Sequence, residues 1–138
     1  MTPPISTYVR FHYIKYNNEN YTLQKIINNF KSLNYNMDLN QSDWSNKSSL
    51  KESNVIIDVR TPEEFDEGFI KNAINLNIYE SSDFVEKIKS FSKNNEYYIY
   101  CKSGGRSSAA CKIMSQMGFN NVYNLMGGIS EWNGEISS

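Results

Sequence analysis

From about residue 53 onward, short apolar runs alternate with stretches of helical pattern. Residues 54–59 are apolar and β-branched at their centre, as expected for a strand buried on both faces. Residues 61–64 follow, with Thr61 as a capping residue, then Pro62 and early acids, which predicts a helix that Gly68 ends. Residues 73–76 are again apolar enough to predict a second, brief strand.

The second half of the chain continues this alternation. Residues 82–91 begin with capping residues and predict a helix with one apolar face, formed by Phe84, Val85, Ile88 and Phe91. Residues 97–100 predict a third strand that leads directly into Cys101, and residues 122–125 predict a fourth. Between these two strands, residues 106–117 predict a helix whose inner stripe consists of Ala109, Ala110, Ile113, Met114 and Met117. A last helical turn is expected around Trp132.

This order of elements defines the fold class. Strands that alternate with helices favour an α/β domain with a central, mostly parallel sheet and helices on both faces. The first fifty residues have a weaker pattern: residues 8–14 suggest a strand, residues 21–33 a helix and the polar residues 34–53 a loop. We therefore treat residues 1–35 as an N-terminal extension or domain entry, and residues 36–138 as the main domain.

Composition and charge narrow the classes of function. A chain of 138 residues has room for one core, and its formal net charge of −1 gives no overall attraction to nucleic acid or anionic lipid. No apolar stretch approaches the roughly 18 to 20 residues of a membrane span, and no signal-peptide core is present. We expect neither a nucleic-acid nor a membrane partner, and a cytoplasmic or organellar location.

The cysteines and the single histidine limit the chemistry further. Cys101 and Cys111 are too few for a disulfide framework or a four-ligand zinc site, and His12 alone cannot form a histidine metal cluster. We expect no metal and no cofactor. If a cysteine is catalytic, a group other than histidine must activate it.

The segment between the third strand and the following helix carries the candidate chemistry. The carboxyl ends of parallel strands are where open α/β sheets bind ligands, and Cys101 lies at such an end. Two glycines let successive N–H groups turn toward one point, and the helix adds its N–H groups and positive dipole. Cys101 is the candidate nucleophile, and the candidate substrate-binding residues are Lys102, Ser103, Gly104, Gly105, Arg106 and Ser107. The alternative is a buried structural cysteine before a glycine-rich turn.

Backbone N–H groups can activate Cys101 by lowering the pKa of its thiol. Lowering a thiol pKa by about 2 units needs roughly 2.7 kcal/mol. Each charge-assisted N–H bond contributes about 1.5 to 3 kcal/mol, and a helix terminus about 0.3 to 1 kcal/mol. Lys102 and Arg106 add positive charge and would attract an anionic substrate.

The chain resembles the rhodanese family in four patches that follow one another in the family's order. They are residues 57–65, residues 68–76, the loop of residues 101–107 and the closing motif of residues 126–132. The resemblance implies a rhodanese-type α/β fold, a persulfide on Cys101 and loop amides that hold its sulfur. It departs at Phe69, where the family often has histidine, and at Asn72 and Asn77.

Loop length separates two chemistries on this fold. Four residues lie between Cys101 and Arg106, whereas cysteine phosphatases use a longer loop. The shorter loop favours sulfur over phosphoryl transfer. Together with the resemblance, this implies transfer of sulfane sulfur from a small anionic donor such as thiosulfate to a thiophilic acceptor, a thiol or a protein. A phosphatase or arsenate reductase and a non-catalytic binding module remain the alternatives.

Three further residues have two interpretations each. Asp58 and Arg60 follow the first core strand and could support the loop electrostatically, with Asp58 orienting Arg106 or a loop amide; the alternative is a local structural ion pair. Cys111 could act as a resolving thiol, but a free cysteine inside a helix is more often a small buried hydrophobe.

Overall fold

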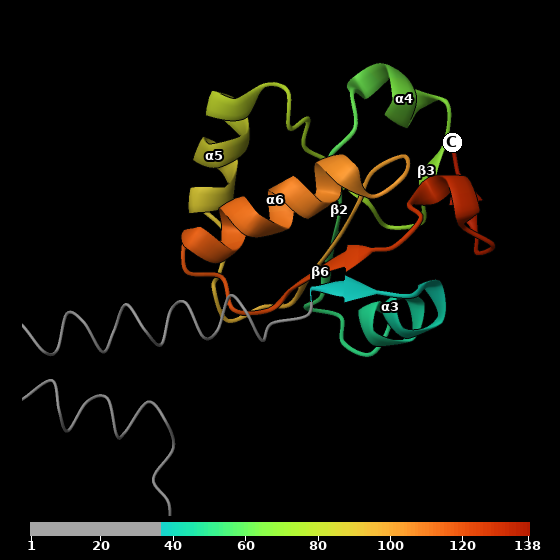
Figure 1. The fold of residues 1–138 in the computed structure, drawn as a ribbon, viewed down its shortest axis with the longest axis horizontal. Coiled ribbons are helices and arrows are strands. Elements are labelled where there is room, and N and C mark those ends of the chain that lie inside the picture. The colour runs from blue at the N-terminus through green and yellow to red at the C-terminus, as the bar shows by residue number, and fades with distance from the viewer. Residues whose placement is uncertain (1–36) are drawn as a thin grey trace, which may run out of the picture. The chain divides into compact units, whose positions relative to one another are not determined.

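A five-stranded parallel sheet forms the centre of the computed structural model, which describes residues 37–138. The strand order is β1-β6-β5-β2-β4, and Figure 1 shows the sheet between its helices. Its strands are β1 (Asp38–Leu39), β2 (Val55–Asp58), β4 (Ile74–Asn75), β5 (Tyr97–Tyr100) and β6 (Val122–Leu125). All four pairings in this sheet are parallel, so the carboxyl ends of the strands share one edge.

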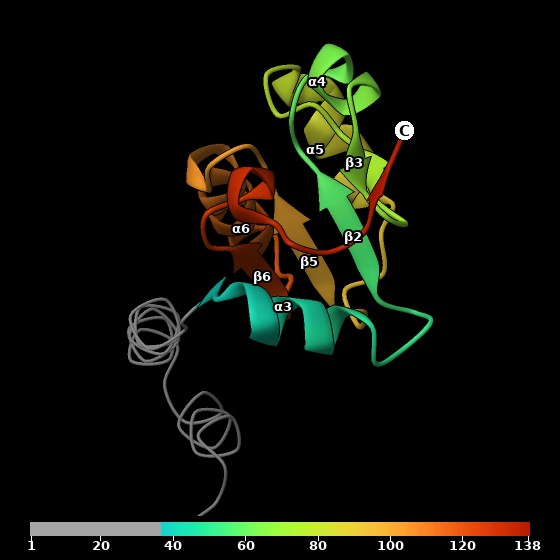
Figure 2. The same ribbon diagram turned by 90° about the vertical axis from the view of Figure 1, so that its right-hand side faces the viewer.

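Helices cover both faces of this sheet, as Figures 1 and 2 show. Helix α3 (Gln41–Ser48) packs on one face, where Trp44 meets Tyr98 and Tyr100 edge to face at ring-centroid distances of 5.8 and 6.1 Å. Helices α5 (Ser81–Lys89) and α6 (Gly105–Gln116) lie on the other face. There Tyr97 packs on Phe119, the residue that follows the end of α6 by a short turn. The strand β5 is therefore buried along its whole length, because successive side chains alternate between two covered faces.

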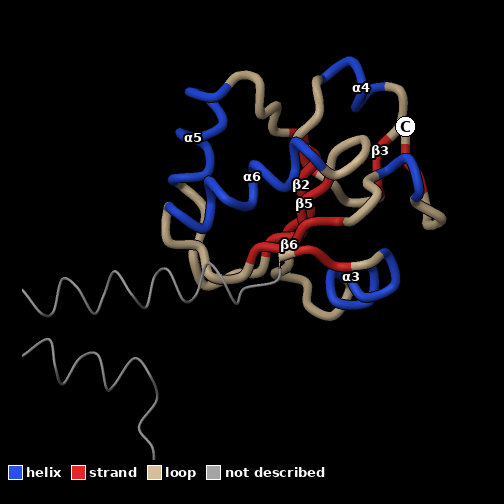
Figure 3. Tube along the Cα trace, viewed as in Figure 1, coloured by secondary structure: helices blue, strands red, loops and turns tan. Residues whose placement is uncertain are grey.

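Smaller elements complete the domain around the carboxyl edge of the sheet. Helix α4 (Pro62–Asp66) begins at a capping box, in which Thr61 and Glu64 bond to each other's backbone N–H. Strand β3 (Phe69–Ile70) pairs antiparallel with β7 (Ile136–Ser137) and so ties the end of the chain to the middle of the sequence. A single 3-10 turn, Ile129–Glu131, precedes Trp132. Figure 3 shows how much of the remaining chain is loop.

The fold class expected from the sequence is confirmed, and two local predictions are wrong. Residues 37–48 do not form a loop, because β1 and α3 lie there. In α6 the buried residues are Ser107, Ala110, Cys111 and Met114, whereas Ala109 is exposed. The inner face of α6 thus includes the small residues Ser107 and Cys111 in place of the predicted Ala109. The predicted strand at residues 8–14 and helix at residues 21–33 lie outside the described residues.

Candidate active site at the Cys101 loop

Cys101 follows β5 directly and lies at the carboxyl edge of the sheet. The chain then turns through residues 102–104 and enters α6 at Gly105. Only 1% of Cys101 is exposed, so its sulfur lies at the bottom of the loop rather than on the surface. A strand, a short loop and a helix N-terminus therefore place one thiol where several backbone N–H groups converge.

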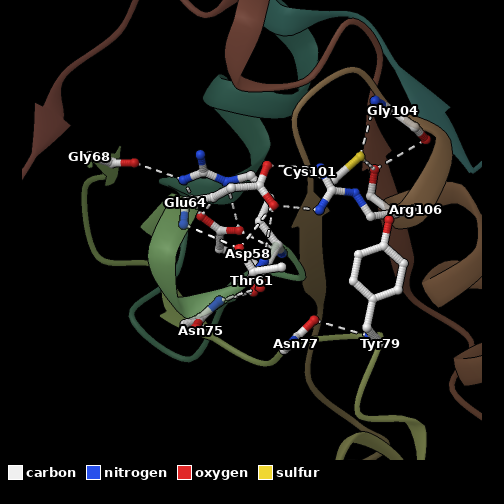
Figure 4. A network of polar contacts seen from close by, with 12 residues as sticks. Asp58, Thr61, Glu64, Gly68, Asn75, Asn77, Tyr79, Cys101, Gly104 and Arg106 are labelled. Carbon is white, nitrogen blue, oxygen red and sulfur yellow. Dashed lines mark hydrogen bonds and ion pairs between the residues drawn. The ribbon is translucent and has the colours of Figure 1, made fainter. Parts of the chain in front are cut away.

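Two hydrogen bonds to the Cys101 sulfur define the site (Figure 4). The Gly104 N–H donates to Sγ at 3.1 Å, and the buried Ser107 hydroxyl lies 3.3 Å from it. Burial by itself raises the pKa of the Cys101 thiol, but the Ser107 hydroxyl and the N–H groups of Ser107, Gly104 and Ser103 more than offset it. The pKa is lowered overall, because these donors stabilise the thiolate more than the thiol.

The glycines of the loop differ in what they contribute. Gly104 has a φ of +113°, which side chains other than glycine rarely adopt, and it is the N-cap of α6. Gly105 lies at the start of α6, has no positive φ and would leave an added Cβ in open space. The conformational requirement therefore falls on Gly104. Lys102 and Ser103 are exposed at the rim of the loop.

Arg106 is held by Glu64 of α4. The guanidinium donates to both carboxylate oxygens, at 2.7 and 3.0 Å, and its other side faces the Tyr79 ring at 5.5 Å (Figure 4). The hydrogen bond from Arg106 lowers the pKa of Glu64 to about 2. The sequence suggested Asp58 as the partner of Arg106, but the structure places Glu64 there. The Thr61-x-x-Glu64 pattern could have identified Glu64 as a capping residue, but not this second contact.

Asp58 and Arg60 form a buried ion pair with each other. The Arg60 Nη2 lies 2.7 Å from the Asp58 carboxylate, and it also donates to the Gly68 carbonyl at 2.7 Å. The local structural pair that the sequence left open is thus present. Because Asp58 lies in register with Tyr100, this pair fixes the segment around Gly68 next to β5, the strand that leads into Cys101.

The closing motif braces the loop from its other side. The Ile129 N–H donates to the Cys101 carbonyl at 2.9 Å, and the Ser130 N–H to the Lys102 carbonyl at 3.0 Å. Gly128 approaches so closely that an added Cβ would lie 2.4 Å from the Lys102 oxygen. The sequence pattern predicted only a helical turn around Trp132, because no local spacing reveals this contact with the loop.

The surroundings of Cys111 and Phe69 indicate a packing role for both residues. Cys111 is fully buried in α6, and burial raises the pKa of its thiol strongly. Phe69, at the position where histidine was expected, stacks on Phe65 with the ring centroids 4.1 Å apart. The departure from the family's pattern at residue 69 is therefore accommodated by an aromatic pair outside the cysteine loop.

Comparison with known proteins identifies the family. The model of the rhodanese-like domain matches residues 42–135. The chain belongs to the rhodanese-like domain family. It is 33% identical over 95 residues to a sulfurtransferase of Allochromatium vinosum, covering 69% of this chain and 86% of that protein. It is 36% identical over 85 residues to thiosulfate sulfurtransferase 16, chloroplastic, of Arabidopsis thaliana, covering 55% of this chain and 71% of that protein.

A solved structure agrees with this family assignment. The rhodanese-like domain protein of Staphylococcus aureus superposes with a TM-score of 0.63 at 29% identity, covering 74% of this chain and 97% of that one. The chain is thus an enzyme of the rhodanese family of sulfurtransferases.

Within residues 37–138, no helix is long and apolar enough to cross a membrane, and no cluster of His, Cys, Asp or Glu is arranged to hold a metal ion.

Proposed function

We propose that this rhodanese-family enzyme transfers sulfane sulfur from a small anionic donor such as thiosulfate to a thiophilic acceptor through a persulfide on Cys101. The observation that carries the proposal is the convergence of the Gly104 N–H and the Ser107 hydroxyl on the Cys101 sulfur. These donors favour a thiolate without a histidine, and a thiolate is the nucleophile that sulfur transfer requires.

The reaction consists of two displacements at sulfur. The Cys101 thiolate attacks the outer sulfur of thiosulfate; a new S–S bond forms, and the old S–S bond breaks as sulfite leaves with its electron pair. An acceptor nucleophile, either cyanide or a thiolate, then attacks the outer sulfur of the persulfide, and Cys101 leaves as a thiolate. The loop N–H groups stabilise negative charge on sulfur in both steps.

The surroundings of the thiol favour a small or slender donor. Cys101 is 1% exposed, so a reacting sulfur atom must reach a thiol that is almost fully enclosed by the loop. Glu64 compensates the charge of Arg106, which leaves Lys102 as the exposed cation of the loop itself. In this proposal Lys102 attracts the donor, and Arg106 mainly maintains the shape of the loop by linking it to α4.

The same ion pair weighs against phosphatase chemistry. A phosphatase needs a guanidinium that is available to bind the transferring phosphoryl group. Here both carboxylate oxygens of Glu64 already occupy the guanidinium of Arg106. A non-catalytic binding module would have no need for the hydrogen bonds that lower the pKa of Cys101.

Mass spectrometry after treatment with thiosulfate tests the proposal. We expect the mass of one sulfur atom to be added at Cys101, and a reductant to remove it. Cys101→Ser should abolish turnover with thiosulfate and cyanide, whereas Cys111→Ala should retain at least about half of it, since Cys111 is a packing residue. Persulfide on Cys111, or hydrolysis of a phosphate monoester without sulfur transfer, would refute the assignment.

A further inference from the structure

Asn124 of β6 is a buried amide whose hydrogen bonds lead to the Cys101 loop. The residue is 4% exposed and lies in register with Asp38 of the neighbouring strand β1. Its Nδ2 donates to the Asp38 carboxylate at 2.9 Å and to the Gly104 carbonyl at 3.3 Å. Both N–H groups of the amide can thus be used, one toward the edge strand and one toward the loop.

The oxygen of the same amide has no hydrogen-bond partner among the described residues. The Asn124 Oδ1 is fully buried, and a buried acceptor without a donor lowers the stability of the folded state. An apolar side chain of similar size would avoid this cost. Folding alone therefore does not account for an asparagine at this position, and the contact with Gly104 is the feature that an apolar side chain could not provide.

The Gly104 carbonyl is the point at which this amide acts. It accepts hydrogen bonds from the Ser108 N–H at 3.0 Å and from Asn124. It also lies 3.2 Å from the Ser107 hydroxyl, whose one hydrogen is shared between this carbonyl and the Cys101 sulfur. The C=O and N–H of a trans peptide point in opposite directions, so fixing this carbonyl also fixes the direction of the Gly105 N–H. That N–H belongs to the first turn of α6, where N–H groups have no partner inside the helix.

We propose that Asn124, oriented by Asp38, is a positioning residue that fixes the carbonyl of Gly104 and thereby the orientation of this residue, whose own N–H holds the sulfur of Cys101. Its effect on the free thiol is independent of the proposed function. Its effect on the outer sulfur of a persulfide rests on that function, because only a sulfur carrier has such an atom to hold.

Asp38 makes the role testable, because loss of its negative charge and loss of its hydrogen bond to Asn124 would change a nearby thiol pKa in opposite directions. The charged and titratable groups around Cys101 include Arg106 and Cys111 of α6, and Asp38 interacts electrostatically with Cys111. Removing a nearby negative charge, with nothing else changed, lowers a thiol pKa. Releasing Asn124, and with it the loop peptide, raises the pKa of Cys101.

The experiment compares Asn124→Leu and Asn124→Ala with a matched control, Asn54→Ala. Asn54 also donates through Nδ2 to two carbonyls, at 3.0 and 3.5 Å, and also has a buried Oδ1 without a partner, but it lies before β2 and away from the loop. The pKa of Cys101 is measured from the ultraviolet absorbance of the thiolate against pH. Subtracting the curve of the same protein carrying Cys101→Ser removes the contribution of the tyrosines.

We expect both Asn124 variants to raise the pKa of Cys101 and to reduce kcat with thiosulfate about tenfold or more, with KM changed less than about twofold. Asn124→Leu should melt no lower than Asn54→Ala, and Asn54→Ala should titrate and turn over like the wild type. Unchanged titration and turnover in a folded Asn124→Leu protein would overturn the proposal.

Asp38→Ala and Asp38→Asn examine the second half of the proposal at a more exposed position. We expect Asp38→Ala to raise the pKa of Cys101, and Asp38→Asn to restore much of the wild-type value, because its amide oxygen still accepts from Asn124. A lower pKa in Asp38→Ala would show that Asp38 acts only through its charge. If the wild type forms no persulfide, the proposed function fails, but the titrations still decide the role of Asn124.

Discussion

At the scale of single residues, Glu64 determines how much positive charge surrounds Cys101. It takes part in the capping box with Thr61 and also holds both nitrogens of the Arg106 fork. One carboxylate thus caps a helix and compensates a cation of the Cys101 loop. The charge available to an anionic donor is therefore smaller than the two cations in the loop sequence suggest.

Glu64→Gln should increase the attraction of anionic donors. Glutamine can still complete the capping box, but it no longer compensates the charge of Arg106. We expect KM for thiosulfate to fall about three- to tenfold, a change equivalent to one partly screened charge. Lys102→Ala should change KM in the opposite direction. Steady-state kinetics at low and high salt measure both effects, and an unchanged KM in both variants would contradict a role for charge in donor binding.

The same carboxylate makes stability depend on pH at the acidic end. The pKa of Glu64 is about 2 in the folded protein and lies below the value of 4.5 for a free side chain. The ion pair therefore stabilises the fold fully above the unfolded value, and its contribution is lost as the pH falls from about 4.5 toward about 2. Urea unfolding should show Glu64→Gln to be less stable by about 1 kcal/mol at about pH 6, and the difference should vanish near about pH 2.

At the scale of elements, the long apolar runs could be predicted and the polar helix could not. Strands β2, β5 and β6 have apolar sequences because both of their faces are covered, and their positions agree with the predictions. Helix α3 escaped prediction because Trp44 is its only large buried residue. The Arg106–Glu64 pair joins residues 42 positions apart, and local spacing carries no information about such a contact.

The start of α6 gives a matched pair of glycine variants. Gly104→Ala forces a side chain into a φ of +113°. We therefore expect the free energy of unfolding to fall by about 1 to 2 kcal/mol and most of the activity to be lost. Gly105→Ala meets open space at a helical φ and should be neutral or stabilising by up to about 1 kcal/mol. Chemical denaturation and turnover measure both variants. Equal losses would show that the loop does not depend on the left-handed residue.

At the scale of the whole domain, the surroundings of the Cys101 loop are assembled from segments distant in sequence. Helix α4 supplies Glu64, strand β6 supplies Asn124, and the closing motif bonds to the carbonyls of Cys101 and Lys102. The four patches that suggested the family are thus the segments that meet around one thiol, or that bind the Asp58–Arg60 pair beside it. The sequence could order these patches but could not show which atoms connect them.

Gly128→Ala tests whether the closing motif maintains the loop. An added Cβ would lie 2.4 Å from the Lys102 oxygen, a backbone atom that cannot rotate away. We expect a loss of about 1 to 3 kcal/mol in stability, as for other overpacked sites, and a fall in turnover of more than about tenfold. Thermal melting and thiosulfate kinetics provide the measurements. Full activity would show that the Cys101 loop does not depend on the closing motif.

In the proposed cycle, the burial of Cys111 affects how long the transferred sulfur stays on Cys101. Its thiol is enclosed in α6 and its pKa is raised, so in the proposed cycle it does not attack the persulfide on Cys101. A sulfur-loaded protein would then wait until an external acceptor arrives. The loaded fraction would follow the ratio of donor to acceptor in the surroundings, and the molecule would serve as a reservoir as well as a catalyst.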